Sequence, residues 1–138
     1  MDKANNLELM IHEEICTYEV CKLAKEKGFP QHIGNDAYIV DNEYDDKYEV
    51  ECYYPIQFIP DYLPTITAPT QSLLQRWLRK EKRIEVNAFW DSVDGIWFSY
   101  AKKMDIPESV VTFMPDEFFI SYESAIEDAL KYALGNLV

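Results

Sequence analysis

The chain has 138 residues, 48% of them hydrophobic and 14% aromatic, which are the length and composition of one folded domain with a core. Its 25 acidic residues outnumber its 13 basic residues, and the resulting formal net charge of −12 opposes binding to phosphate backbones and to anionic membranes. Only four glycines are present, which argues against a glycine-rich phosphate-binding loop.

The N-terminal sequence MDKANNLELMIHEE has no basic start followed by an apolar stretch, so it lacks the pattern of a secretion signal. No apolar run approaches the roughly 20 residues that a membrane-spanning helix needs. The three cysteines (Cys16, Cys21 and Cys52) are an odd number, which is typical of reduced thiols in a reducing compartment. We therefore expect a cytoplasmic protein with no membrane contact.

The N-terminal part predicts one helix and two strands. The helix begins at Thr17, which can cap it, and ends at Gly28 in the sequence TYEVCKLAKEKGF. Residues 5–15 before it fit either an amphipathic turn or a short strand. Residues 37–40 and 48–54 read as strands that pair across a solvated acidic turn.

A middle helix follows an irregular, proline-rich and aromatic segment at residues 53–69. Thr67 is the predicted cap of this helix, and Pro69 suits its first turn. The predicted core residues of the helix are Leu74, Trp77 and Leu78, because they recur at helical spacing. The aromatic residues of the segment before it fit either the core or an interface.

The C-terminal part predicts a hairpin, a further strand and a last helix. Residues 84–90 and 96–103 read as strands joined by the loop DSVDG, in which the aspartates serve local hydrogen bonds rather than form a catalytic pair. Residues 117–121 read as a strand that leads into a helix capped by Ser121 and ended at Gly135-Asn136.

These elements predict an α+β fold with an antiparallel sheet of three to five strands and two or three helices packed on it. The sheet is expected to contain residues 84–90, 96–103 and 117–121, with 48–54 as an extension, which gives an α-β-β-β-α order in the C-terminal half. We expect a single domain, residues 1–138, made of an N-terminal subregion 1–54, a connector 53–69 and a C-terminal core 69–138.

No group of residues forms a known catalytic or metal-binding pattern. The acidic run from Asp41 to Glu49 departs from a calcium loop, because Asp46 stands where a glycine is needed and Cys52 where a glutamate is needed. The two histidines, His12 and His32, have no identifiable catalytic partner. We therefore predict no catalytic residue, no metal, no cofactor and no small-molecule substrate.

Two features favour an interaction surface. Five basic residues fall within residues 76–83, and we interpret them as the solvent face of the middle helix, paired with the protein's own acids; the alternative is a weak nucleic-acid site. The predicted hairpin has large aromatic residues on both faces. Either both faces are covered by the rest of the protein, or one of them binds a partner. The candidate interaction residues are Arg76, Arg79, Lys80, Trp97 and Phe89.

The middle helix with its flanks, APTQSLLQRWLRKEKRIEV, then a hairpin, then SYESAIEDALKYALGNLV, resembles a group of small proteins encoded by prophages and mobile elements of gut anaerobic bacteria. The segment TYEVCKLAKEKGF resembles the first helix of that group. The group has no known activity, so the resemblance implies a phage-related accessory protein and supplies no site residue.

The favoured function is a non-enzymatic, acidic protein–protein interaction module that binds another protein or forms a homodimer. One alternative is a DNA mimic that inhibits a DNA-binding enzyme, which needs carboxylates spread over one face at phosphate-like spacing. A second is nucleic-acid binding through residues 76–83, which the net charge disfavours. A third is an unrecognised enzyme with a pocket around His32 and two or more carboxylates.

Overall fold

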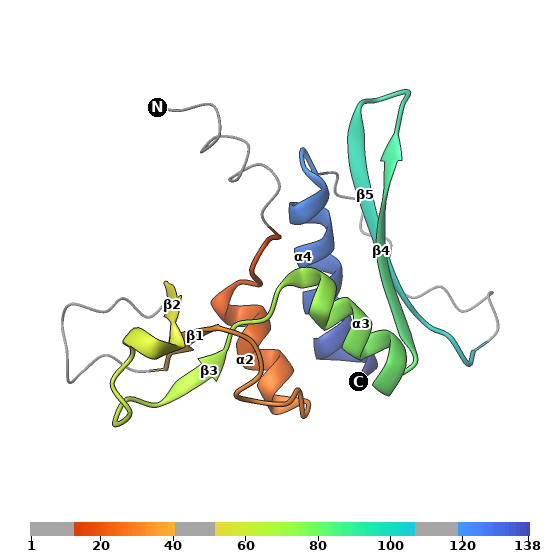
Figure 1. Cartoon of the computed structure of the whole chain (residues 1–138). Coiled ribbons are helices and arrows are strands. Elements are labelled where there is room, and N and C mark those ends of the chain that lie inside the picture. Colours follow the sequence, from red (N-terminus) through yellow and green to blue (C-terminus); the bar gives the residue numbers. More distant parts are fainter. Residues whose placement is uncertain (1–12, 41–51, 107–118) are drawn as a thin grey trace, which may run out of the picture.

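The computed structural model describes residues 13–40, 52–106 and 119–138 (Figure 1). His12, the acidic run 41–49 and parts of two predicted strands (47–51 and 117–118) lie outside the described residues. Within the described ranges the fold is α+β, as predicted, with three helices and two antiparallel sheets. The predicted single sheet is wrong, because the strands divide into a three-stranded sheet and a separate hairpin.

The first helix, α2 (Tyr18–Glu26), begins as predicted at Thr17, whose side chain accepts a hydrogen bond from the Val20 N–H. Gly28 follows the helix with φ +96, a left-handed conformation that glycine adopts without steric cost. Val20, Cys21 and Ala24 are buried and form the core-facing side of the helix.

The three-stranded sheet contains β1 (Asp36–Ile39), β2 (Tyr53–Pro55) and β3 (Thr65–Thr67) in the order β2-β1-β3. The pairing of Ala37 with Tyr54 and of Tyr38 with Tyr53 confirms, for the described residues, the expected pairing of strands 37–40 and 48–54. Tyr53 and Tyr54 therefore belong to this sheet and not to the hairpin. The proline-rich connector contributes a 3-10 turn, η1 (Ile56–Phe58), and β3 itself. Some apolar residues of the connector, Ile59 and Leu63, are buried, whereas its aromatic residues Phe58 and Tyr62 are exposed.

The middle helix, α3 (Gln71–Glu81), begins three residues later than predicted, with Thr70 as its cap. Thr67 cannot cap the helix because it belongs to β3, where its hydroxyl accepts a hydrogen bond from the His32 N–H at 2.7 Å. Leu74 and Leu78 are fully buried, as predicted. Trp77 is only half-buried at the edge of the core, where its ring meets Phe29 edge-on at 5.3 Å.

The hairpin consists of β4 (Ile84–Asp91) and β5 (Ile96–Lys103), which pair at eight positions. Gly95 closes its turn with φ +68, donating its N–H to the Asp91 carbonyl at 2.8 Å. The predicted third strand is reduced, in the described residues, to one bridge in which Trp97 and Phe119 exchange backbone hydrogen bonds of 2.8 and 2.9 Å.

The last helix, α4 (Tyr122–Tyr132), is capped by Ser121 as predicted and continues into a π-helical turn, η2 (Ala133–Leu137). The predicted stop at Gly135-Asn136 is therefore wrong. Gly135 is not among the residues with positive φ, and Asn136 Nδ2 donates to the Tyr132 carbonyl within the turn.

The main core lies between the helices and the hairpin. α3 and α4 pack on β4, and α2 lies between the three-stranded sheet and α4 (Figure 1). Both faces of β1 are covered. Tyr38 joins the main core, whereas Ala37 and Ile39 point to the other face and join a second small cluster under the connector.

Candidate functional site

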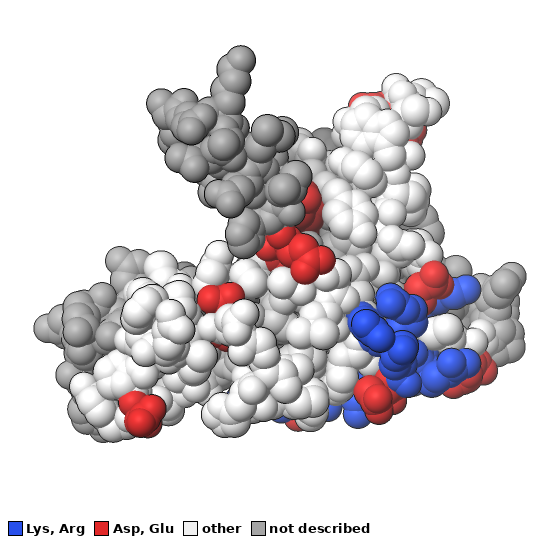
Figure 2. Space-filling model, in the orientation of Figure 1, with Lys and Arg blue, Asp and Glu red and all other residues white. Residues whose placement is uncertain are grey.

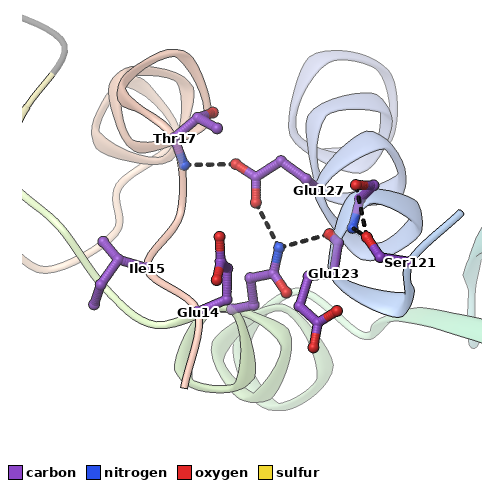
Figure 3. A pocket seen from close by; sticks show the side chains of 8 residues that line it. Glu14, Ile15, Thr17, Ser121, Glu123 and Glu127 are labelled. Atoms are coloured by element: carbon purple, nitrogen blue, oxygen red, sulfur yellow. Dashed lines mark hydrogen bonds between the residues drawn. The ribbon is translucent and has the colours of Figure 1, made fainter. Parts of the chain in front are cut away.

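A pocket of about 330 Å³ lies where the N-terminal ends of α2, α3 and α4 meet (Figure 3). Backbone contacts between two distant segments bring these ends together. The Cys16 N–H donates to the Pro69 carbonyl at 2.9 Å, and the Gln71 N–H donates to the Glu14 carbonyl at 2.8 Å. The lining residues are Glu14, Ile15, Thr17, Gln71, Ser121, Glu123, Ser124 and Glu127.

Glu127 joins the three helices at this pocket. One carboxylate oxygen accepts the Thr17 backbone N–H at 2.6 Å, and the other accepts Gln71 Nε2 at 2.7 Å. Gln71 Nε2 also donates to the Glu123 carbonyl at 2.9 Å, so both protons of this amide, on a residue only 5% exposed, have acceptors. The carboxylate also lies at the N-terminus of α2, where the helix dipole favours negative charge.

The chemistry of this pocket is that of a structural junction. Three glutamates (Glu14, Glu123 and Glu127) face the positive ends of three helix dipoles and offset them. No group of three His, Cys, Asp or Glu residues within the described ranges could hold a metal ion. The contacts of Glu127 and Gln71 in this pocket therefore join the three helices.

From the sequence, Gln71 and Glu127 are expected on the solvent-facing sides of their helices because both are polar, and this expectation is wrong. Gln71 in fact shares the face of Leu74 and Leu78, at spacing i, i+3 and i+7. Glu127 similarly precedes the buried Leu130 and Leu134 by three and seven positions. A polar residue at a core position of the helical repeat was therefore the available signal.

The predicted basic residues form an exposed patch where α3 ends and the hairpin begins (Figure 2). Arg76, Arg79 and Lys80 are exposed, as predicted. The register of the hairpin places Lys103 opposite Ile84 and Lys102 opposite Glu85, so two lysines distant in sequence lie at the edge of the patch, on opposite faces of the hairpin. We use the name basic patch for Arg76, Arg79, Lys80, Lys82, Arg83, Lys102 and Lys103.

The expectation that these cations pair with the protein's own acids is mostly wrong. Arg83 pairs with Asp105 at 3.3 Å, and the Lys82 ammonium lies 5.4 Å from the centre of the Trp77 ring. In residues 13–40, 52–106 and 119–138 no ion pair involves Arg76, Arg79 or Lys80. The three side chains extend into solvent. At exposed positions the energy of an ion pair is smaller than the entropic cost of holding a long side chain in one conformation.

Trp97 and Phe89 lie towards the other end of the hairpin and on opposite faces of it. Trp97 is half-buried, with the rings of Trp90 and Tyr122 each 5.3 Å away. Phe89 is 41% exposed and stacks on Phe98. The five predicted interaction residues therefore do not form one surface.

The remaining candidates have local roles. Asp91 Oδ1 accepts the Val93 N–H at 2.9 Å inside the hairpin loop, as expected for a turn aspartate. His32 lines a small pocket of about 70 Å³ in which Asp36 is the one carboxylate among the described lining residues. A hollow of about 420 Å³ between α2 and α4 lies beside the ion pair of Lys131 and Glu19, 3.1 Å apart.

Cys16 and Cys21 are free thiols that are buried beside each other. The pKa of the Cys16 thiol is raised well above its ordinary value, first by its hydrogen bond with Cys21, then by burial and by the nearby Glu127 carboxylate. The Cys21 thiol in turn donates to the Cys16 carbonyl at 3.6 Å. A thiol that stays protonated is a poor nucleophile, so this pair belongs to the core.

The chain matches no protein-family model, and neither a curated protein nor a solved structure shows significant similarity to it. Among the helices of the described residues, none has the length and apolar character needed to cross a membrane.

Proposed function

We propose that this protein is a non-enzymatic protein–protein interaction module that contacts its partner through the distal end of the β4–β5 hairpin. The observation that carries the proposal is the exposure of large apolar side chains at this end. We use the name distal surface for Trp90 (51% exposed), Val93 (89%) and Ile120 (89%); Phe89 (41%) lies at the same end but on the opposite face of the hairpin.

The distal surface differs from the scattered apolar residues of an ordinary surface. Trp90 packs against Trp97, which in turn meets Tyr122, so its ring is held in place rather than free to fold back. A tryptophan with a fixed orientation loses little entropy on binding, and aromatic residues of this kind dominate the energy of protein interfaces. The hairpin also carries few charged side chains on the face drawn in Figure 2.

The partner that fits is a different protein with an apolar surface bordered by basic residues. Two copies of a chain with net charge −12 repel each other, which disfavours a homodimer through this end. Asp91 and Asp94 lie in and beside the hairpin turn, next to the exposed Val93. Basic residues on the partner would complement these carboxylates and speed the encounter.

The competing functions receive less support. On the face drawn in Figure 2 the acidic side chains of the described residues form small separate groups, rather than the single array that DNA mimicry requires. The pocket of His32 holds one carboxylate, where the enzyme hypothesis requires two or more. The expected cytoplasmic location and phage-related origin rest on the sequence alone, the origin on the family resemblance.

The test combines affinity capture with matched variants. The binding partner is captured on immobilised parent protein, identified and purified, and its dissociation constant is then measured by calorimetry. We expect Trp90→Ser and Val93→Ser together to weaken binding at least roughly tenfold, which is about 1.4 kcal/mol. Leu73→Ser is the control, because it removes a similarly exposed apolar side chain (36%) from α3.

Two results would overturn the proposal. One is a partner that binds the double variant as tightly as the parent protein. The other is a stable homodimer of the purified parent in sedimentation equilibrium that the double variant abolishes, because the distal surface would then be occupied by a second copy.

A further inference from the structure

The basic patch has more positive charge than the local structure explains. The dipole of α3 favours cations in the last helical turn, and this accounts for Arg79 and Lys80. It does not account for Lys102 and Lys103, which belong to β5 and lie beside the start of β4 through the pairing of the hairpin strands, with their side chains on opposite faces and Lys102 on the face of Glu85. The patch collects seven of the 13 basic residues of a strongly acidic chain.

The cations of the patch are also available for binding. Three acidic residues lie in the same segments, but Asp105 is the one that forms an ion pair there, with Arg83. Glu85 lies opposite Lys102 in the hairpin and forms no ion pair within the described residues. Arg83 itself has φ +56, a conformation in which a glycine would be less strained, so its cation is kept at some cost to the backbone.

We propose that the basic patch docks a short acidic segment of a partner protein. Carboxylates suit it, because arginine can donate two parallel hydrogen bonds to one carboxylate and the neighbouring lysines add positive charge. The proposal depends on the function proposed above only in taking the partner to be a protein. It concerns a different surface, at the opposite end of β4 from the distal surface.

The size of the patch favours a peptide over a nucleic acid. Four helical steps from Arg76 to Lys80 and the width of two paired strands give a patch roughly 15 Å across. An extended peptide of about five residues covers this length at roughly 3.3 Å per residue. The acidic segment then meets the patch and little else.

A DNA duplex bound across the protein would contact much more of the protein surface than the basic patch. A domain of this length is roughly 35 to 40 Å wide, and duplex DNA carries about one charge per 1.7 Å, so about 20 phosphates would lie along the protein. The patch would neutralise a few of them, and the rest would face a surface whose charge is negative, since the whole chain has net charge −12.

The probe for this proposal is a fluorescein-labelled peptide with about six consecutive glutamates, followed by fluorescence anisotropy at about 50 mM salt. The test variant carries Arg76→Gln, Arg79→Gln and Lys80→Gln, all at exposed positions. The control variant carries Lys22→Gln, Lys25→Gln and Lys27→Gln, which remove the same charge from α2 and the residue after it. Circular dichroism and thermal unfolding verify that both variants fold.

We expect saturable binding to the parent protein that the test variant weakens at least roughly tenfold and the control variant less than about twofold. Binding should also weaken as salt is raised to about 200 mM, since the contacts are exposed. Trp90→Ser should leave peptide binding unchanged, so a failure of the distal surface and a failure of the basic patch are distinguishable.

Three results would overturn the proposal. The first is no saturable binding of the glutamate peptide to the parent. The second is an equal loss of binding in the two triple variants, which would mean a response to net charge alone. The third is tighter binding of a single-stranded RNA or duplex DNA that the test variant loses, because the patch would then be a nucleic-acid site.

Discussion

The Glu127 side chain offers the most direct test of how the three helices are held together. We predict that Glu127→Ala lowers the free energy of unfolding by about 2 to 4 kcal/mol. The Thr17 N–H lies at an exposed position and can donate to water instead, so the loss of its hydrogen bond to Glu127 contributes about 1 kcal/mol. Gln71 is 5% exposed and retains the Glu123 carbonyl alone, so one buried proton without an acceptor contributes about 1 to 3 kcal/mol more.

A second substitution, Glu127→Gln, removes the charge of the side chain and keeps its shape. The amide introduced by Glu127→Gln has one accepting oxygen, so it can satisfy one of the two donors that now reach the carboxylate at 2.6 and 2.7 Å. Its NH₂ group then opposes the other donor. We expect this variant to lose about half as much stability as Glu127→Ala, about 1 to 2 kcal/mol.

The assay is urea unfolding followed by circular dichroism, with the slope of the transition compared between variants. Glu123→Ala is the control, because Gln71 uses the backbone carbonyl of Glu123 and not its carboxylate. Its loss removes one acidic residue from the first turn of α4 and should cost less than about 1 kcal/mol. If Glu127→Ala costs no more than this control, the junction does not hold the helices together.

Three further predictions concern the core. Within the described residues the buried hydroxyl of Ser99 has no hydrogen-bond partner, so Ser99→Ala should raise the free energy of unfolding by about 1 kcal/mol in urea titrations, and a loss would show a hidden partner. Trp77→Ala should cost about 2 to 3 kcal/mol in the same assay, less than a fully buried tryptophan, because Trp77 is half-buried. Since folding raises the pKa of Cys16, the unfolded chain loses that proton first, and stability should fall by about 1.4 kcal/mol per pH unit above pH 9.0; an unchanged slope in Cys16→Ala would contradict this.

The features that the sequence predicted correctly depend on residues close together in the chain. Thr17 and Ser121 cap their helices by accepting an N–H three residues later, and a motif of that length can be read directly. The same rule failed at Thr67, because Thr67 and Thr70 both precede the helix and offer a cap. Thr70 is the cap because Thr67 belongs to β3, and β3 pairs with residues 37–39, some 30 positions earlier in the chain.

The features that the sequence did not predict depend on distant contacts. Thr17 and Glu127 are 110 positions apart, and no local pattern relates them. The division into two sheets is of the same kind, since each strand alternates in the same way whichever partner it takes. The basic patch shows this for a surface: residues 76–83 are visible in the sequence as a cluster, but Lys102 and Lys103 join it only through strand register.

The two proposed surfaces lie at opposite ends of one strand, and this constrains how partners can bind. β4 extends from Ile84 beside the basic patch to Asp91 beside the distal surface, a distance of about 23 Å at roughly 3.3 Å per residue. An interface of ordinary size, about 800 Å² on each partner, is roughly 30 Å across and can cover both ends. One partner that does so must offer apolar and basic groups at one end and acidic groups at the other. In that case substitutions at the two ends weaken the same complex, and their free-energy effects add because the sites are far apart. If the partners differ, each set of substitutions weakens one complex and leaves the other unchanged, so measuring both variants against each purified partner decides between one ligand and two.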